Sequence, residues 1–346
     1  MKRLRQFPLI TPSDIPPTRE DLVVYCTINP AATRFQGKII LLVRVGETVN
    51  TEEGFVPHLY YDHKSRQVVV RRISKQDPNF GEGDGRGYRY GDTTLCTSMS
   101  HLRVARSTDG INFTVDESPA LYPSDEYEAY GIEDARITYL DAKFHITYTA
   151  LSHHGVGVGL ASTADFKTFV RHGLIFPPYQ KNVCLFPEKI EGMYVCRHRP
   201  QKSEFNQACI WTARSPDLLC WGHHCVTLSP KPGTWQGGRV GAGAAPIRTE
   251  EGWLEVYHAS DENGRYCLGT MLSSLDEPER LLSHSSQPFL EPKIEYELAG
   301  VYKATVFCNG LVVGEDGNVT IYYGAADTVC AAAVTTIKEM IEMAKR

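Results

Sequence analysis

Two adjacent carboxylates, Glu133 and Asp134, stand in the middle of residues 130–137, and Arg136 follows them. A positioned carboxylic acid can donate a proton to a departing alkoxide, so either group is a candidate general acid. Successive side chains of a strand point to opposite faces. We therefore expect one carboxylate to face a cavity and the other to form a structural contact, with Arg136 on the face of Asp134. A structural ion pair between neighbouring sheets is the alternative interpretation of the whole segment.

Polar residues recur beside other hydrophobic segments of the chain, at comparable positions. The basic residues suited to an anion are Lys189, Arg199, Arg239 and His258. The residues suited to a sugar are Asn29, Arg44, Arg103, Tyr257 and Asp327. Basic side chains give charge-assisted hydrogen bonds to phosphate, whereas Asn and Asp bind hydroxyl groups and Tyr rings stack on a pyranose. If the segments are equivalent copies, these groups share one pocket that fits a sugar and an oxyanion.

Two other motifs are interpreted as non-functional. The glycine-rich run 237–243 lacks the Gly-Lys-Ser/Thr ending of a nucleotide-binding loop and precedes a strand instead of a helix. The histidine pairs at 153–154 and 223–224 could suggest a metal. Adjacent histidines on a strand point to opposite faces, however, and no acidic residue has a useful spacing. We therefore expect no metal.

Five copies of a turn followed by a hydrophobic strand position these residues. They cover residues 37–45, 142–150, 192–199, 252–259 and 317–325. Their spacing is typical of four-stranded propeller blades. The sequence predicts an all-β fold, a five-bladed β-propeller, in one domain over residues 1–346. An extended N-terminal arm (1–25), an insertion in the first blade (47–100) and a short C-terminal helix (335–346) complete the prediction.

Composition narrows the possible partners and compartments. The net charge of −5 gives no reason to expect nucleic acid or an anionic membrane surface as a partner. No apolar run approaches the roughly 18 residues that cross a bilayer, and the N-terminus lacks the pattern of a signal peptide. Most of the ten cysteines stand singly in apolar strands, as reduced buried thiols do. We expect a cytoplasmic protein, possibly a homo-oligomer.

Residues 131–136, 185–190, 198–200, 252–258 and 322–327 together resemble glycoside hydrolase family 130. The resemblance covers nearly the whole chain, from about residue 29 to residue 327, and implies a five-bladed propeller that acts on β-mannosides. Most members of the family are inverting phosphorylases that release α-mannose 1-phosphate, and a minority are inverting β-1,2-mannosidases. The chain departs from the family pattern where Ala135 replaces a frequent Pro, Ala259 a frequent Gly and Arg239 a frequent Lys.

The resemblance also implies residue roles. Asp134 matches the catalytic acid, which acts through the mannose 3-hydroxyl. The implied phosphate ligands are Arg199, Arg239 and His258, with Lys189 beside them. Asn29, Arg44 and Asp327 match positions that line the mannose site. Inorganic phosphate would be a co-substrate, and no other cofactor is expected.

Phosphorolysis and hydrolysis make different demands on the site. An inverting hydrolase needs a second carboxylate about 6.5–9.5 Å from the acid, whereas a phosphorylase needs cations that aim the phosphate. The motifs supply cations, so we predict phosphorolysis of β-1,2- or β-1,4-linked mannosides. Hydrolysis by a β-1,2-mannosidase is the alternative, with Glu188 or Glu255 as the base. A non-catalytic sugar-binding propeller would lack the acid or the cations, and both are present.

Overall fold

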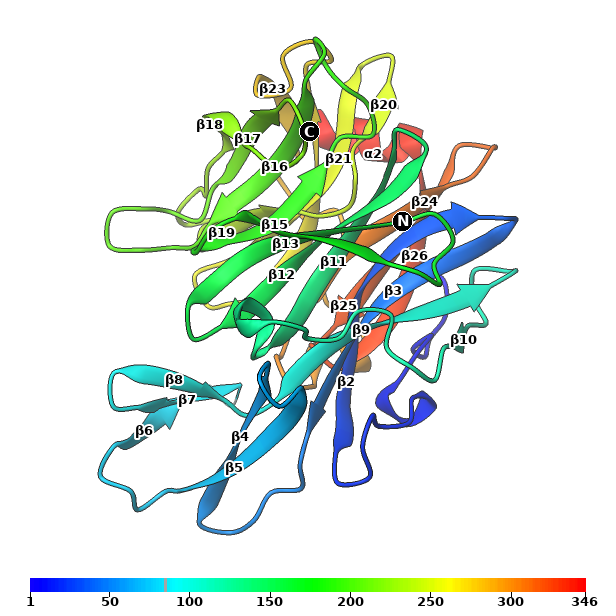
Figure 1. Cartoon of the computed structure of the whole chain (residues 1–346). Helices are drawn as coiled ribbons and strands as arrows, with labels where there is room; N and C mark the ends of the chain where they lie inside the picture. Colours follow the sequence, from blue (N-terminus) through cyan, green and yellow to red (C-terminus); the bar gives the residue numbers. More distant parts are fainter. Residues whose placement is uncertain (84–85) are drawn as a thin grey trace.

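The computed structural model describes residues 1–83 and 86–346, and it is built almost entirely of antiparallel β-sheets (Figure 1). The largest sheet has the order β14-β13-β12-β11-β9-β3-β2, with β10 beside β9. Its strands are β2 (Val23–Phe35), β3 (Lys38–Thr48), β9 (Met99–Ser107), β10 (Thr114–Val115), β11 (Gly131–Leu140), β12 (Lys143–Ser152), β13 (Gly155–Thr163) and β14 (Val170–Phe176). A single parallel pair, Gly131 with Ser100, joins its two halves.

Three further sheets complete the main body. The first has the order β15 (Gln180–Leu185), β16 (Tyr194–Pro200), β17 (Ile210–Ser215) and β18 (Gly222–Leu228). The second has the order β19 (Arg239–Ala242), β21 (Gly252–Ser260), β22 (Tyr266–Ser273) and β23 (Leu281–His284), with β20 (Ile247–Thr249) beside β21. The third has the order β1 (Lys2–Arg3), β26 (Val329–Thr336), β25 (Asn318–Ala325) and β24 (Val306–Val313).

The five recurring hydrophobic segments form β3, β12, β16, β21 and β25. Each of these strands has antiparallel partners along both edges, and most of its residues are buried, so its sequence is apolar on both faces of the sheet. The polar residues described below lie on these strands (Arg44, Arg199 and His258), on the adjacent strands β2, β11, β15 and β19 (Asn29, Glu133, Asp134, Lys181, Asn182 and Arg239), and after β25 (Asp327). The all-β class is confirmed, whereas the number of blades stays a prediction.

The segment 47–100 forms separate small sheets at the lower left of Figure 1. One pairs β4 (Phe55–Asp62) with β5 (Gln67–Ser74), and the other contains β6 (Phe80–Gly83), β7 (Gly87–Tyr90) and β8 (Thr93–Cys96). These strands are not part of the main sheets, and their assignment as an insertion in the first blade stays a prediction. The N-terminal segment contains only β1 and the 3-10 turn η1 (Pro12–Asp14) before β2 begins at Val23.

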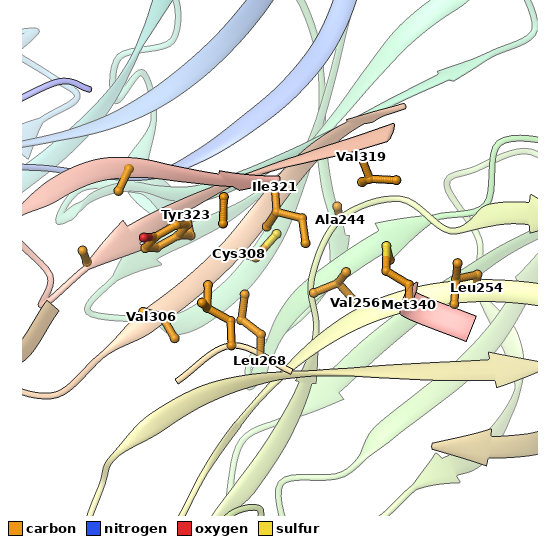
Figure 2. Close-up of a cluster of buried hydrophobic side chains, with 14 of the residues drawn as sticks. Ala244, Leu254, Val256, Leu268, Val306, Cys308, Val319, Ile321, Tyr323 and Met340 are labelled. Carbon is orange, nitrogen blue, oxygen red and sulfur yellow. The ribbon is translucent and has the colours of Figure 1, made fainter. Parts of the chain in front are cut away.

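The C-terminal helix α2 spans Ile337–Ala344, two residues inside the predicted start. Thr336 caps it by accepting a hydrogen bond from the Glu339 backbone N–H at 3.1 Å. Met340 and Ala344 of this helix enter the hydrophobic core between the β19–β23 and β24–β26 sheets, shown in Figure 2. Two short turns were not predicted, α1 (Glu295–Leu298) and η2 (Glu126–Glu128).

Two expectations about the chain as a whole can be compared with the structure. All ten cysteines are free thiols, as the prediction of reduced cysteines requires. Among the helices of the described residues, none has the length and apolarity needed to cross a membrane.

Candidate active site

The predicted catalytic carboxylate lies in a cluster around one arginine. Arg44 donates from Nη1 to Asp134 Oδ1 at 3.1 Å and from Nη2 to Glu133 Oε1 at 2.7 Å. Asn29 Nδ2 also donates to Asp134 Oδ1, at 2.8 Å. Lys181 Nζ lies 3.3 Å from Glu133 Oε2. The structure therefore brings the predicted residues Asn29, Arg44 and Asp134 together.

The expectation that Glu133 and Asp134 face opposite sides is wrong, and a β-bulge is the reason. The register of β11 with β12 shifts between Glu133 and Arg136, and Asp134 has the left-handed φ of 50°. The bulge breaks strict alternation and turns both carboxylates toward Arg44. Arg136 instead donates to the backbone oxygens of Asp134, Ala242 and Gly243. Arg136 is therefore a buried structural residue that links neighbouring sheets through these hydrogen bonds.

The same combination of a β-bulge and a left-handed residue occurs on other strands of the site. Asn29 (φ 49°) lies at a bulge of β2, and Asn182 (φ 55°) lies at a bulge of β15. Asn and Asp adopt left-handed φ more easily than other residues with a side chain, which makes them suited to these positions. The close approach of β25 to β2 also requires a glycine at position 324, because a Cβ there would lie 2.0 Å from Asn29 Oδ1.

Electrostatics divide the three acidic groups of the cluster. Burial opposes ionisation of Glu133 and Asp134, but Arg44 and Lys181 outweigh it, so both pKa values are lowered, that of Asp134 to about 2. Asp327 is affected differently. Burial, followed by the nearby charges of Asp134 and Glu133, raises the pKa of Asp327 to about 6 against the opposing effect of Arg44. One arginine is thus shared among three acids.

Arg199 and His258 lie on neighbouring sheets, β15–β18 and β19–β23, and are the candidate anion-binding group. Nε and Nη1 of Arg199 are buried and have no hydrogen-bond partner among residues 1–83 and 86–346. Burial, together with Arg239 and Arg136, lowers the pKa of Arg199 to about 10, although Tyr266 works in the opposite direction. A buried guanidinium with unused donors is costly unless an anion completes it.

A hydrogen-bond relay sets the proton position on His258. Arg136 Nη2 donates to Asn182 Oδ1 at 3.2 Å, which fixes the amide so that Nδ2 faces His258 Nε2 at 3.0 Å. Nε2 must then accept, so the ring proton is on Nδ1, a buried atom without a partner in the described part of the chain. Burial and then Arg199 lower the pKa of His258 well below its ordinary value. The ring is a neutral donor, not the cation that was predicted.

The glycine-rich run 237–243 has a packing role here. A Cβ on Gly241 would lie 2.3 Å from His258 Nε2 and 2.6 Å from Asn182 Nδ2. Gly241 therefore makes room for the relay. Neither Asn182 nor Lys181 was singled out from the sequence. An Asn inside an apolar strand, where it favours a bulge, is the signal that could have identified Asn182.

The remaining predicted phosphate ligands differ in position. Arg239 is exposed at the start of β19, and its guanidinium lies 5.9 Å from the centre of the Tyr266 ring. Its effect on the pKa values of Arg199 and His258 places it beside the anion-binding group. Lys189 is a correction. It lies beyond the end of β15 opposite to Lys181, is exposed, and pairs with Asp141 at 3.7 Å. Lys181 on β15 lies directly opposite Arg199 on β16, and it is the lysine at the site.

Two predicted sugar ligands also lie outside the cluster. Tyr257 is fully buried on the opposite face of β21 from His258, where its hydroxyl donates to Gln236 Oε1 at 3.0 Å. Arg103 is fully buried on β9, where its Nε lies 3.1 Å from His101 Nε2. It pairs with Val43, the neighbour of Arg44, and therefore faces the other side of the sheet.

The two bases proposed for hydrolysis are engaged elsewhere. Glu255 is buried and forms an ion pair with Arg197, whose Nε donates to Glu255 Oε2 at 2.9 Å. Glu188 is exposed and accepts from Arg248 at 3.0 Å. A second carboxylate nevertheless lies near Asp134, because Glu133 accepts from the same arginine, Arg44.

The chain can now be compared with known proteins. Residues 87–346 match the family model for glycoside hydrolase family 130, described as beta-1,4-mannooligosaccharide phosphorylase. The chain belongs to glycoside hydrolase family 130. A β-1,2-mannobiose phosphorylase of Listeria innocua is 38% identical over 344 residues, which cover 98% of this chain and 97% of that protein. A β-1,4-mannooligosaccharide phosphorylase of Ruminococcus albus is 32% identical over 262 residues, 72% of this chain and 77% of that protein.

A solved structure gives the same result for this family 130 chain. The Listeria innocua β-1,2-mannobiose phosphorylase in complex with β-1,2-mannobiose aligns with a TM-score of 0.95 at 38% identity. The alignment covers 99% of this chain and 98% of that one. The resemblance stated from the five motifs is confirmed.

Proposed function

We propose that this family 130 enzyme is an inverting phosphorylase that cleaves β-mannosides with inorganic phosphate and releases α-mannose 1-phosphate. The observation that carries the proposal is the pair Arg199 and His258. They offer three buried donor atoms that have no partner in the described ranges. A phosphate has enough acceptor oxygens to bind all three, whereas a water molecule cannot neutralise the buried charge of Arg199.

The chemistry follows from a single displacement. A phosphate oxygen forms the new bond to the anomeric carbon while the bond to the glycosidic oxygen breaks, and the leaving oxygen takes a proton. Attack from the face opposite the leaving group inverts the configuration, so a β-mannoside gives an α-phosphate. We assign phosphate binding to Arg199, Arg239 and His258, and place Lys181 at the border with the acidic cluster.

Asp134 is assigned the role of proton donor. Its low pKa means that the carboxyl group is ionised in the free enzyme at neutral pH. A bound mannose would exclude water and take over the contact of Asn29, and both changes raise the pKa of a carboxyl group. The mannose 3-hydroxyl then lies between Asp134 and the glycosidic oxygen and relays the proton. Asn29, Arg44 and Asp327 hold the sugar hydroxyls.

The finer features of the proposal are the linkage, the blade count and the compartment. We favour a β-1,2-linked substrate because the relative that covers 98% of the chain is named for that linkage. The contacts of β2 with β11 and β24, and of β15 with β11 and β19, favour a ring of five blades. Ten free thiols favour a reducing compartment such as the cytoplasm. Assembly into a homo-oligomer stays a prediction.

The test is to incubate the enzyme with β-1,2- and β-1,4-mannobiose, with and without phosphate. Proton NMR of the first product should show α-mannose 1-phosphate only when phosphate is present. Free mannose formed without phosphate would make the enzyme a mannosidase, and a β-configured phosphate would refute the single displacement.

A further inference from the structure

A cluster of metal-ligating side chains lies apart from the residues assigned above. Glu126, His153 and His154 each offer one ligand atom, and these atoms all lie within 4.8 Å of one another. His154 Nε2 is 3.1 Å from Glu126 Oε2, and the centres of the two imidazole rings are 3.9 Å apart. The sequence argument against a metal assumed that the histidines are on a strand and lack an acidic partner. For residues 153–154, both assumptions are wrong.

The local structure explains the convergence. Strand β12 ends at Ser152 and β13 begins at Gly155, so the two histidines occupy the turn between them, where strand alternation does not apply. Glu126 comes from η2, 27 residues earlier than His153 in the chain, and the Tyr127 ring packs against His154 at 5.4 Å. Sequence spacing alone could not reveal this partner.

The insertion lies close to this cluster. His63, in the turn between β4 and β5, interacts electrostatically with Glu126. The insertion is already tied to this region, because the Tyr61 N–H donates to the Ala129 carbonyl at 2.7 Å. Tyr130, which leads into β11, donates to the Leu151 carbonyl at 2.8 Å. The cluster thus lies where the insertion, the β12–β13 turn and the start of the catalytic strand meet.

We propose that Glu126, His153 and His154 bind a divalent late first-row metal ion, with Zn²⁺ as the preferred ion. Two imidazoles and one carboxylate are a frequent zinc ligand set, and a fourth position is left for water. Tetrahedral bonds of about 2.0–2.2 Å require ligand atoms about 3.4 Å apart. The Glu126–His154 contact is already close to that separation. The side chains of these two residues are 44% and 42% exposed, so they can rotate to close the remaining gap.

The bound ion would link segments of the chain that are distant in sequence. It would join η2 to the β12–β13 turn. Binding to the folded state alone stabilises a protein by mass action. The melting temperature should therefore rise with Zn²⁺ concentration, whether or not mannoside is present.

The experiment is calorimetric titration of Zn²⁺ in phosphate-free buffer. The background variant should carry Cys220→Ser, because Cys220 is an exposed thiol that could bind zinc by itself. We expect one ion per chain. Glu126→Gln and His154→Ala should each weaken Zn²⁺ binding by at least about 10–100-fold. That is the loss caused by removing a residue that only hydrogen-bonds to a metal ligand, whereas these two residues are proposed as ligands.

The matched control is His223→Asn, which removes one histidine of the other adjacent pair. His223 is exposed and has a left-handed φ of 52°, which Asn tolerates. This variant should bind Zn²⁺ like the background protein. Equal affinity in all variants, or no binding, would overturn the proposal. Co²⁺ substitution gives a second measurement, because a sulfur-to-cobalt charge-transfer band would show that cysteine, not this cluster, holds the ion.

Discussion

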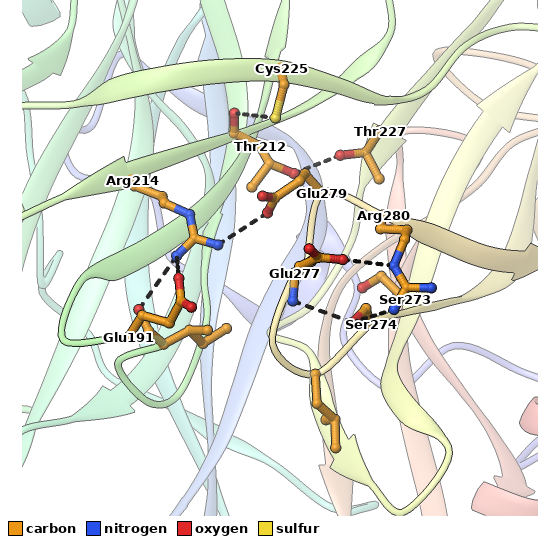
Figure 3. A network of polar contacts seen from close by, with 12 residues as sticks. Glu191, Thr212, Arg214, Cys225, Thr227, Ser273, Ser274, Glu277, Glu279 and Arg280 are labelled. Carbon is orange, nitrogen blue, oxygen red and sulfur yellow. Dashed lines mark hydrogen bonds and ion pairs between the residues drawn. The ribbon is translucent and has the colours of Figure 1, made fainter.

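Two arginines on one strand should respond in opposite ways to the same substitution. Arg197 and Arg199 are both buried on β16, with 0% and 7% of their surface exposed. Arg197 is fully paired, with Glu255 and with the hydroxyls of Thr212, Thr227 and Ser273. Figure 3 shows these three hydroxyl residues between the β15–β18 and β19–β23 sheets. Arg199 instead keeps two donors without a partner in the described part of the chain.

The magnitude follows from the pKa of Arg199, which falls from 12.5 to about 10. At about 1.4 kcal/mol per pKa unit, keeping this guanidinium charged costs roughly 3 kcal/mol of folding free energy. The folded state holds the proton less tightly than the unfolded state, so this cost is present at every pH below about 10. Arg199→Met keeps most of the side-chain volume and removes the charge. It should raise the free energy of unfolding by about 1–3 kcal/mol without phosphate.

Arg197→Met is the matched control. It leaves Glu255 buried and unpaired, which should lower the free energy of unfolding by about 3–5 kcal/mol. Urea unfolding at pH 7 in phosphate-free buffer measures both variants. Phosphate at ten times its Kd should stabilise the wild type by about 1.4 kcal/mol and should stabilise Arg199→Met much less. If Arg199→Met is destabilised, or keeps the full response to phosphate, then Arg199 is not an uncompensated anion-binding charge.

Three further predictions concern the acidic cluster and its lysine. Asp134→Asn should lower kcat on an unactivated mannoside by at least about 10²–10⁴-fold with an unchanged circular dichroism spectrum, and near wild-type turnover would contradict its role as acid. Lys181→Gln should raise the KM for phosphate or mannoside in steady-state assays, whereas Lys189→Gln should leave both KM values unchanged. The reverse pattern would support Lys189 as the phosphate ligand, as the sequence motif predicted. Asp327 has a raised pKa of about 6, so wild-type stability should fall as pH rises from about 4 through 6. Asp327→Asn should remove that fall, worth up to about 3 kcal/mol, and a pH-independent difference in thermal unfolding between the two proteins would argue against a raised pKa.

Much of the fold could be predicted because it depends on local patterns. The five apolar segments became strands with two partners each, and Thr336 caps the helix whose apolar stripe had been recognised. The insertion interrupted the repeat and was visible for that reason. The one-turn helix α1 was missed because its four residues, Glu295–Leu298, are too few to show a helical period.

The site was less predictable because it depends on departures from regular structure. Alternation separates Tyr257 from His258, which the prediction of one shared pocket overlooked, and it fails at Asp134, where one extra residue turns the chain. Lys189 looked equivalent to other cations by sequence, yet it follows β15 at the end away from Arg199. Contacts between distant segments, such as Glu126 with His154, leave no local trace.

The bulges connect these observations to the chemistry. A regular strand would present every second side chain to the centre of the site, which would separate Glu133 from Asp134. Left-handed residues at Asn29, Asp134 and Asn182 let neighbouring side chains reach the same region. At Asp134 the result is a carboxyl group held by Asn29 and Arg44, and at Asn182 it is a relay that leaves His258 Nδ1 as a donor. The same kind of bulge thus positions both the proposed acid, Asp134, and the proposed donor to the phosphate, His258.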